Sequence, residues 1–222
     1  MDTEATGKKS SAVRPALCSF ANGPHRELIR RVLPTWQAWA DSNGFDIVIR
    51  SDNLSGRPPS WMKVPIIYEQ LRNRPLVLWV DADAYFARSD APLNLPEEAG
   101  FAVRTTEGSL GKIPQLGVIA ARPQPWVFDL LGEMWRQEDL IESAWWEQTA
   151  FMRLCGFTWK QDGRPHPYDC QMSNPTPAWE RCSALDERFN VTGLSPVDDP
   201  IIHHMNGISH EQRMSILDDA GL

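Results

Sequence analysis

The sequence predicts one α/β domain, built on a mixed, mostly parallel sheet that is flanked by helices. Its 222 residues suit a single domain with a full hydrophobic core. Strand-like and helix-like stretches alternate from residue 16 onward, which is typical of parallel, helix-covered sheets. Residues 75–80 form an uninterrupted apolar run, the pattern of a central strand buried on both faces. Residues 1–13 lack hydrophobic periodicity, so we expect a disordered leader followed by a single domain over residues 14–222.

The first half of the domain predicts a β-α-β unit followed by a second helix and the central strand. The short apolar run at residues 16–20 predicts a strand, because Asn, Gly and Pro follow it. Apolar side chains at helical spacing predict helices over residues 27–40 and 62–71. Pro65 falls in the first turn of the second helix, where proline is tolerated. Residues 45–49 supply the strand between these helices.

The second half predicts a strand pair and two further helices. Two apolar stretches flank a glycine-rich connection, which favours two strands joined by a loop. A longer amphipathic stretch follows, and after it Ser143 is a candidate N-cap for the next helix. Ile201 and Ile202 form the last apolar pair before two histidines. The expected strands are 101–103 and 116–121 around the connection at 108–111, and the expected helices are 125–140 and 143–154.

The composition argues against several classes of protein. The chain has a formal charge of −7 at pH 7, and its 22 Lys and Arg residues are scattered, so the basic stripe of a nucleic-acid binder is missing. No apolar run is long enough for a membrane span, and no hydrophobic signal segment follows the first residues, so we expect a cytoplasmic protein. The four cysteines are too widely spaced for a disulfide framework or a Cys-x-x-Cys zinc site.

Asp81-Ala82-Asp83 is the first candidate functional motif. On a strand, two acids separated by one residue point to the same face while Ala82 points away. They follow the most apolar run of the chain, and ligands of open α/β sheets collect at such strand ends. Because unpaired acids repel each other there, a bound Mg²⁺ or Mn²⁺ that bridges phosphate oxygens explains the pair. The alternative is a helix N-cap beside a solvated loop acid, since Asp-x-Asp is common by chance.

Several segments together resemble one enzyme family. In GT-A fold glycosyltransferases, an apolar strand that contains a tryptophan is followed by Asp-Ala-Asp-Ala. Residues 74–84 resemble this segment, particularly as it occurs in the galactosyl-, mannosyl- and xylosyltransferases of the α-1,2-galactosyltransferase type. Further segments agree in the same order. They are Lys63 with the helix through Leu71, residues 115–123 with Trp126, the Glu-Gln segment at 145–151, and the His-x-x-Gly segment at 201–207.

The resemblance implies a GT-A-like, Rossmann-related fold and a metal-dependent transferase. It makes Asp81 and Asp83 the metal-binding pair and His204, rather than its neighbour His203, the third ligand of a Mn²⁺ or Mg²⁺ ion. Glu147 and Gln148 match the catalytic positions that face the donor sugar and the acceptor, although a solvated helix turn is the alternative for them. The residues expected to bind the sugar nucleotide are Asp81, Ala82, Lys63, Asp52, Arg104, Gly117, Gly207 and His210.

The implied reaction moves a hexose or pentose from a nucleoside-diphosphate sugar to an acceptor hydroxyl with retention of configuration. Among the donors a UDP-sugar is favoured over a GDP-sugar. The metal stabilises the charge that develops on the leaving diphosphate, so no protein acid is required. Lys63, Arg104 and Arg213 are candidate phosphate contacts. The tryptophans at 126, 145 and 146 are candidates for stacking on sugar rings or for core packing.

The sequence departs from the family pattern at two places. Members of these families often carry a lysine shortly after the His-x-x-Gly glycine, but Ile208, Ser209 and His210 stand there. The phosphate contact then falls to His210 or Arg213. Gln115 and Leu116 stand where Asn-Asn or Asn-Ser usually precedes the glycine at position 117, so the family's standard donor-sugar contact is not expected there.

Two other functions are compatible with parts of the sequence. A haloacid dehalogenase-type phosphatase also needs Asp-x-Asp after an apolar strand, and Asp198-Asp199 could supply its later acids. That fold places the motif on its first strand and has Thr or Val where Tyr85 stands, which argues against it. The second alternative is a catalytically weak sugar-nucleotide-binding module.

Overall fold

The computed structural model describes residues 12–53, 55–108, 111–159 and 170–222. Residues 1–11 of the expected leader lie outside this range, as do residues 109–110 of the expected glycine-rich connection. The chain enters the fold directly at its first strand, β1 (Ala16–Phe20). Every residue of that strand is buried, as expected for an interior strand covered on both faces.

A six-stranded mixed sheet forms the centre of the molecule. Its strands are ordered β2-β1-β3-β6-β5-β9. Three of the pairings, β2 with β1, β1 with β3 and β5 with β9, are parallel, whereas β6 runs antiparallel to both of its neighbours. This confirms the predicted mixed, mostly parallel sheet. The remaining bounds are β2 (Asp46–Arg50), β3 (Val77–Val80), β5 (Phe101–Gly108), β6 (Gly111–Ala121) and β9 (Cys182–Ala184).

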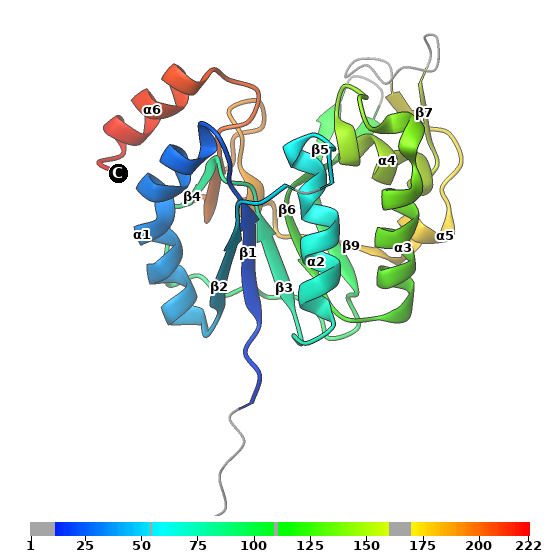
Figure 1. The fold of residues 1–222 in the computed structure, drawn as a ribbon, viewed down its shortest axis with the longest axis horizontal. Helices are drawn as coiled ribbons and strands as arrows, with labels where there is room; N and C mark the ends of the chain where they lie inside the picture. The colour runs from blue at the N-terminus through cyan, green and yellow to red at the C-terminus, as the bar shows by residue number, and fades with distance from the viewer. Residues whose placement is uncertain (1–11, 54, 109–110, 160–169) are drawn as a thin grey trace, which may run out of the picture.

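Helices cover both faces of this sheet (Figure 1). On one side lie α1 and α6, and on the other α2, α3 and α4. The buried side chains divide accordingly into two clusters, one on each face. The apolar faces of the predicted amphipathic helices therefore pack against the two faces of the sheet. The helices are α1 (His25–Asn43), α2 (Lys63–Leu71), α3 (Pro125–Arg136), α4 (Trp146–Cys155), α5 (Pro177–Arg181) and α6 (His210–Asp219).

Two small antiparallel sheets complete the fold. The strands β4 (Ala84–Phe86) and β10 (Ile202–His204) pair so that Ala84 lies opposite His204. The second small sheet joins β7 (Phe157–Trp159) to β8 (Cys170–Met172). The β4–β10 pairing matters for function, because it brings the segment after Asp81-Ala82-Asp83 beside the histidines near the end of the chain.

Some predicted boundaries were wrong. The helix expected over residues 125–140 ends at Arg136, and a 3₁₀ turn, Glu138–Leu140, follows because Gln137 has non-helical angles. Ser143 does not cap α4, which begins at Trp146 after an N-cap at Trp145. The Ser143 hydroxyl instead donates to the carbonyl oxygen of Trp146, at 3.3 Å.

The helix α6 was not predicted, because its apolar stripe is weak and only Leu217 is buried. A local signal was nevertheless present. The Ser209 side chain accepts from the backbone N–H of Gln212, whose side chain accepts from the backbone N–H of Ser209, a capping box. Ser-x-x-Gln after Gly207 could therefore have indicated a helix start.

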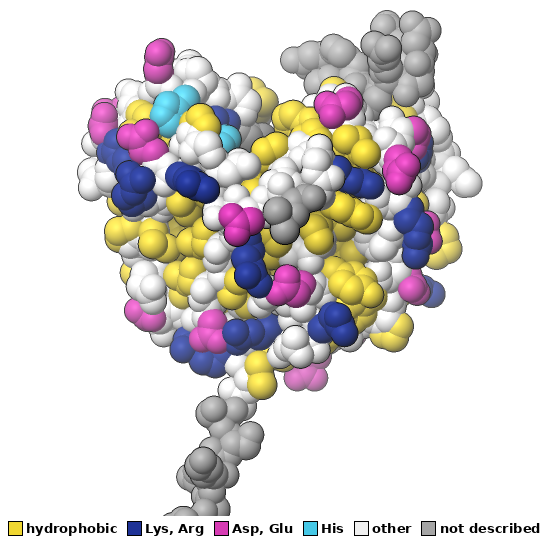
Figure 2. Space-filling view, in the orientation of Figure 1, with side chains coloured by type: hydrophobic (Ala, Val, Ile, Leu, Met, Phe, Trp, Pro, Cys, Tyr) yellow, Lys and Arg dark blue, Asp and Glu magenta, His cyan; other side chains and the backbone are white. Residues whose placement is uncertain are grey.

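The surface carries no concentration of one charge on the face drawn in Figure 2, where Lys and Arg lie interspersed with Asp and Glu. None of the helices in the described part of the chain has the length and apolar character needed to cross a bilayer.

Candidate active site

A cavity of about 390 Å³ opens at the carboxyl ends of β1 and β3. Its walls come from segments far apart in the sequence: the end of β1, the start of α1, the segment before α2, the turn after β3, the start of α4 and the loop after β10. Strand ends of an open α/β sheet are the usual place for a ligand. Most of the residues predicted from the sequence as a site reach this cavity.

Asp81 and Asp83 lie in a tight turn rather than on a strand. The backbone N–H of Asp81 still donates to the Gly117 carbonyl oxygen of β6, at 2.8 Å, but the N–H of Ala84 donates back to the Asp81 carbonyl oxygen at 3.1 Å. The chain turns here because β4 leaves the central sheet to pair with β10. The expected strand geometry was therefore wrong, and Ala82 lines the cavity while it also belongs to a buried hydrophobic cluster.

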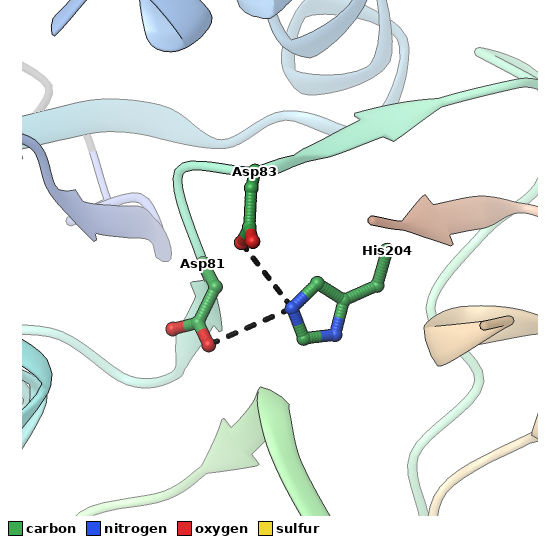
Figure 3. Close-up of side chains that lie close together, drawn as sticks. All are labelled: Asp81, Asp83 and His204. Carbon is green, nitrogen blue, oxygen red and sulfur yellow. Dashed lines mark ion pairs between the residues drawn. The ribbon is translucent and has the colours of Figure 1, made fainter. Parts of the chain in front are cut away.

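His204 completes a cluster with the two acids (Figure 3). Its Nε2 atom lies 3.3 Å from Asp83 Oδ1 and 3.8 Å from Asp81 Oδ2. One donor atom from each of the three residues lies within 4.8 Å of the other two. His203 points to the opposite face of β10 and stacks on Tyr85, with ring centroids 5.0 Å apart. Two carboxylates and one imidazole nitrogen in this arrangement suit a divalent cation such as Mn²⁺.

The electrostatics of this cluster favour the charged form of the Asp83 carboxylate. Burial alone would raise the pKa of Asp83, but His204 and Arg213 outweigh it and hold that pKa well below its usual range. Arg213 contributes through an ion pair, with Nη2 2.9 Å from Asp83 Oδ2. Burial would lower the pKa of His204, but the neighbouring Asp83 and Asp81 raise it above its ordinary value. The charged carboxylate of Asp83 thus suits a cation ligand, because metal ligands bind in their deprotonated form.

A buried ion-pair network joins Asp81 to Glu147 at the start of α4. Lys63 Nζ lies 2.7 Å from Glu147 Oε1 and 3.2 Å from Asp81 Oδ1, and it donates to the Leu116 carbonyl oxygen at 2.9 Å. Burial would lower the pKa of Lys63, but the acids raise it to about 12. Burial raises the pKa of Glu147, against the opposing effect of Lys63. Lys63 therefore links the carboxylates of Asp81 and Glu147 and holds both in place.

The strand β6 bulges next to this network. The register of β5 against β6 shifts between Val103 and Arg104, so residues 116–118 have no partner in β5. Side chains take up the freed backbone groups: Leu116 N–H donates to Gln148 Oε1 at 3.2 Å, and its carbonyl oxygen accepts from Lys63. Bulges of this kind re-aim side chains beside active sites. Here the backbone of Leu116 in the bulge bonds to Lys63 of α2 and to Gln148 of α4, so the three elements meet beside the cavity.

The start of α4 presents two tryptophans to the cavity. Trp146 is 43% exposed, and its φ of 47° is in the left-handed region that a bulky residue rarely adopts. Such strain persists where surrounding contacts enforce it and is concentrated at functional sites. Trp126, the third candidate, donates to the side chain of Gln124, outside this cavity.

The remaining predicted residues divide into two groups. Gly117, Gly207, Gln148 and Ala82 line the cavity, whereas Asp52, Arg104 and His210 are not among its lining residues. Arg104 is buried, and its guanidinium donates to the Asn190 carbonyl oxygen. His210 lies 3.6 Å from Glu27 in a half-exposed pair. Arg213, from the same helix, does reach the cavity.

Sequence reasoning missed two residues of this region. His25, at the start of α1, lines the cavity close enough to Asp83 to lower the pKa of that carboxyl. Asn190 is fully buried and contacts the His204 ring, at 2.9 Å from Oδ1 to Nδ1. Neither lies in a recognisable motif, because both are brought to the site by tertiary structure alone.

The fold is that of known glycosyltransferases. A glycosyltransferase involved in glycosylation of the major capsid of PBCV-1 superposes with a TM-score of 0.67 at 14% identity, covering 93% of this chain and 99% of that chain. The galactosyltransferase LgtC, solved with donor and acceptor sugar analogues, superposes with a TM-score of 0.58 at 11% identity over 92% of this chain and 95% of its own.

A third similar structure is the bifunctional glycosyltransferase WbbM, with a TM-score of 0.59 at 12% identity. It matches 94% of this chain but only half of its own length. No protein-family model matches the sequence, and no curated protein matches it. The solved structures thus establish the fold.

The phosphatase alternative gains nothing from the structure. Asp199 pairs with Arg88 and, at 3.8 Å, with Arg188. Neither Asp198 nor Asp199 is among the residues that line the cavity with Asp81 and Asp83. The later acidic pair that a phosphatase of that type needs is therefore not supplied by these two residues.

Proposed function

We propose that this protein is a metal-dependent glycosyltransferase that moves a hexose or pentose from a nucleoside-diphosphate sugar to an acceptor hydroxyl, with retention of configuration. The observation that carries the proposal is the convergence of Asp81, Asp83 and His204 on one cavity that Glu147 also lines, in a fold shared with glycosyltransferases. The cavity volume, about 390 Å³, is in the range of small-ligand sites.

The donor's diphosphate belongs beside the acidic cluster. Asp81, Asp83 and His204 would hold Mn²⁺ or Mg²⁺ there, and the bound ion supplies Lewis-acid stabilisation of the charge on the departing diphosphate. The protein's own contribution is to fix these three donors. The turn at residues 81–83 orients the carboxylates, and the β4–β10 pairing brings His204 to them.

The sugar belongs on the wall formed by α4. The Oε2 atom of Glu147 is buried and has no hydrogen-bond partner among the described residues, while Oε1 is held by Lys63. A buried carboxylate oxygen without a partner is costly, so a sugar hydroxyl that donates to it would relieve the cost. Gln148 lies beside it on the same wall, and Trp145 and Trp146 stand at the cavity edge, where an acceptor ring could stack.

A panel of nucleotides tests this function directly. We expect UDP-sugars, more than GDP-sugars, to raise the melting temperature in the presence of Mn²⁺, because a ligand that binds only the folded state stabilises it by mass action. The measurement is a thermal-shift assay with and without Mn²⁺, followed by transfer assays with the donor that binds. If no nucleotide shifts the transition, the transferase proposal fails. Binding without transfer to any acceptor would favour the binding-module alternative.

Arg213 is the residue that we propose to contact the diphosphate in place of the missing lysine. Its guanidinium lies at the cavity, held by Asp83 and by a hydrogen bond from Nε to the Met205 carbonyl oxygen at 2.9 Å. Arginine suits this role because its planar fork presents several donors to phosphate oxygens. His210, the other sequence candidate, lies outside the lining residues.

The variant Arg213→Gln should weaken UDP binding roughly tenfold or more, the effect of losing a charge-assisted contact of about 1.5–3 kcal/mol. His210→Gln, on the same helix, is the matched control and should bind UDP as the wild type does. Calorimetry with UDP and with uridine separates the roles: loss of phosphate contact affects UDP alone. Equal weakening of both ligands would show that Arg213 acts only on the fold.

A further inference from the structure

Two residues beside the imidazole of His204 belong to no metal-site motif. They are Gly117 in the β6 bulge and Asn190, the last residue of a 3₁₀ turn, Glu187–Asn190. Gly117 leaves room for the ring, and Asn190 contacts its Nδ1 atom, while Nε2 faces Asp83.

Gly117 provides the space for the ring. Its backbone angle lies outside the left-handed region, so conformational freedom does not explain the glycine. A Cβ atom at this position would lie 2.1 Å from His204 Cε1 and 2.3 Å from Nδ1. Any side chain at residue 117 therefore collides with the ring, and His204 can reach the acids only because this residue is glycine.

Asn190 fixes the tautomer of the ring. Its Oδ1 lies 2.9 Å from His204 Nδ1, and a carbonyl oxygen can only accept, so Nδ1 carries the hydrogen. The amide orientation is fixed in turn, because Nδ2 donates to the Gln115 carbonyl oxygen at 3.3 Å. The neutral ring must then present a lone pair on Nε2, the atom that faces Asp83.

The backbone around Asn190 is held firmly. Arg104, at the register shift of β5, donates from Nη1 to the Asn190 carbonyl oxygen at 2.6 Å and from Nη2 to the Ser195 hydroxyl at 2.7 Å. The adjacent Val191 runs beside β10, and the His204 backbone N–H donates to its carbonyl oxygen at 2.8 Å. Arg104, a sequence candidate for phosphate contact, thus orients the residue that orients His204.

We propose that Asn190 is a positioning residue for the cation site, which makes His204 a preorganised Nε2 ligand by holding the hydrogen on Nδ1. Without an acceptor at Nδ1, the hydrogen of the neutral ring would move to Nε2, where Asp83 and Asp81 accept it, and the ring could no longer ligate a cation in that direction. The proposal rests on the cation site of the proposed function and concerns metal affinity, independently of sugar transfer.

The test compares Asn190→Leu with Thr192→Val, a buried polar residue two positions further along the same segment. We expect Asn190→Leu to weaken Mn²⁺ binding on the order of 10- to 100-fold, as outer-shell changes do, and Thr192→Val to leave it unchanged. Asn190→Asp keeps an acceptor and should bind Mn²⁺ within a few-fold of the wild type. Free Mn²⁺ is measured by electron paramagnetic resonance.

Nitrogen NMR of ¹⁵N-histidine protein gives the second readout. The His204 signal is identified by its loss in His204→Gln, and with the ring neutral and no metal present we expect the wild type to carry the hydrogen on Nδ1 and Asn190→Leu on Nε2. Because the wild-type spectrum needs no Asn190 variant, the test survives if Asn190→Leu fails to fold. Gly117→Ala, whose new Cβ atom would collide with the ring, should also weaken Mn²⁺ binding.

Three results would overturn the inference: a wild-type hydrogen on Nε2, unchanged Mn²⁺ affinity in a folded Asn190→Leu, or a wild type that binds no Mn²⁺. The last of these also removes the cation site from the proposed function. If Mn²⁺ binding depends on Asn190 but no sugar nucleotide binds, the inference stands and the proposed function fails.

Discussion

Replacing Asp83 with asparagine is expected to abolish the Mn²⁺-dependent part of nucleotide binding while the fold is retained. Asp83 is buried, stays ionised because His204 and Arg213 hold its pKa low, and gives one of the three donors of the cluster. Asparagine keeps the shape but removes the charge, so the loss in cation affinity should exceed the roughly 10- to 100-fold typical of outer-shell changes. Thermal-shift titration with Mn²⁺, with and without UDP, measures it.

Asp90→Asn is the matched control for this change. Asp90 is exposed, lies shortly after β4 and pairs only with Arg88 among the ion pairs of the described residues. Its loss should leave both the Mn²⁺ response and the melting temperature close to those of the wild type. A Mn²⁺-dependent shift that persists in Asp83→Asn would show that the cation binds elsewhere.

Replacing Lys63 with methionine should give the largest loss of stability among single changes at this site. Lys63 and Glu147 are both buried and 2.7 Å apart, so removing the cation leaves a carboxylate without its partner. Breaking a buried pair in this way costs about 3–5 kcal/mol. The change is measured as the free energy of unfolding in urea.

A second substitution separates this cause from lost packing. In Lys63→Met/Glu147→Gln no unpaired charge remains between these two residues, so much of the lost stability should return. Arg50→Met, which breaks the exposed pair of Arg50 with Glu69, should change stability by only about 0–1 kcal/mol. If the double variant is as unstable as Lys63→Met, the ion pair is not the cause.

The central part of the fold could be predicted from the sequence because its signals are local. The apolar run before Asp81 and the stripes of α1 and α3 reflect burial that the sequence shows directly. The helix α6 was not predicted, because it buries little apolar surface. The start of α4 was predicted wrongly, because Trp146 adopts a left-handed backbone angle that no propensity favours. Surrounding contacts hold Trp146 in that conformation, whereas the start of α6 has a local signal in the Ser209–Gln212 capping box.

The candidate site was predicted in part for the same reason. Asp81, Asp83 and Glu147 lie in local motifs, but how the acids converge depends on β4 leaving the central sheet, which no spacing shows. Lys63 was expected at the phosphates and lies beneath the acids, because the bulged carbonyl of Leu116 and the Glu147 carboxylate hold it there. Asn190 had no signal at all.

The three candidate cation-binding residues come from two different parts of the fold. Asp81 and Asp83 follow β3 of the central sheet, whereas His204 belongs to β10, which the central sheet does not include. An ion held by all three would act as a noncovalent cross-link between the core and the last part of the chain. The last part of the chain, which also carries Arg213, could then detach locally only if the contact between the ion and His204 were broken.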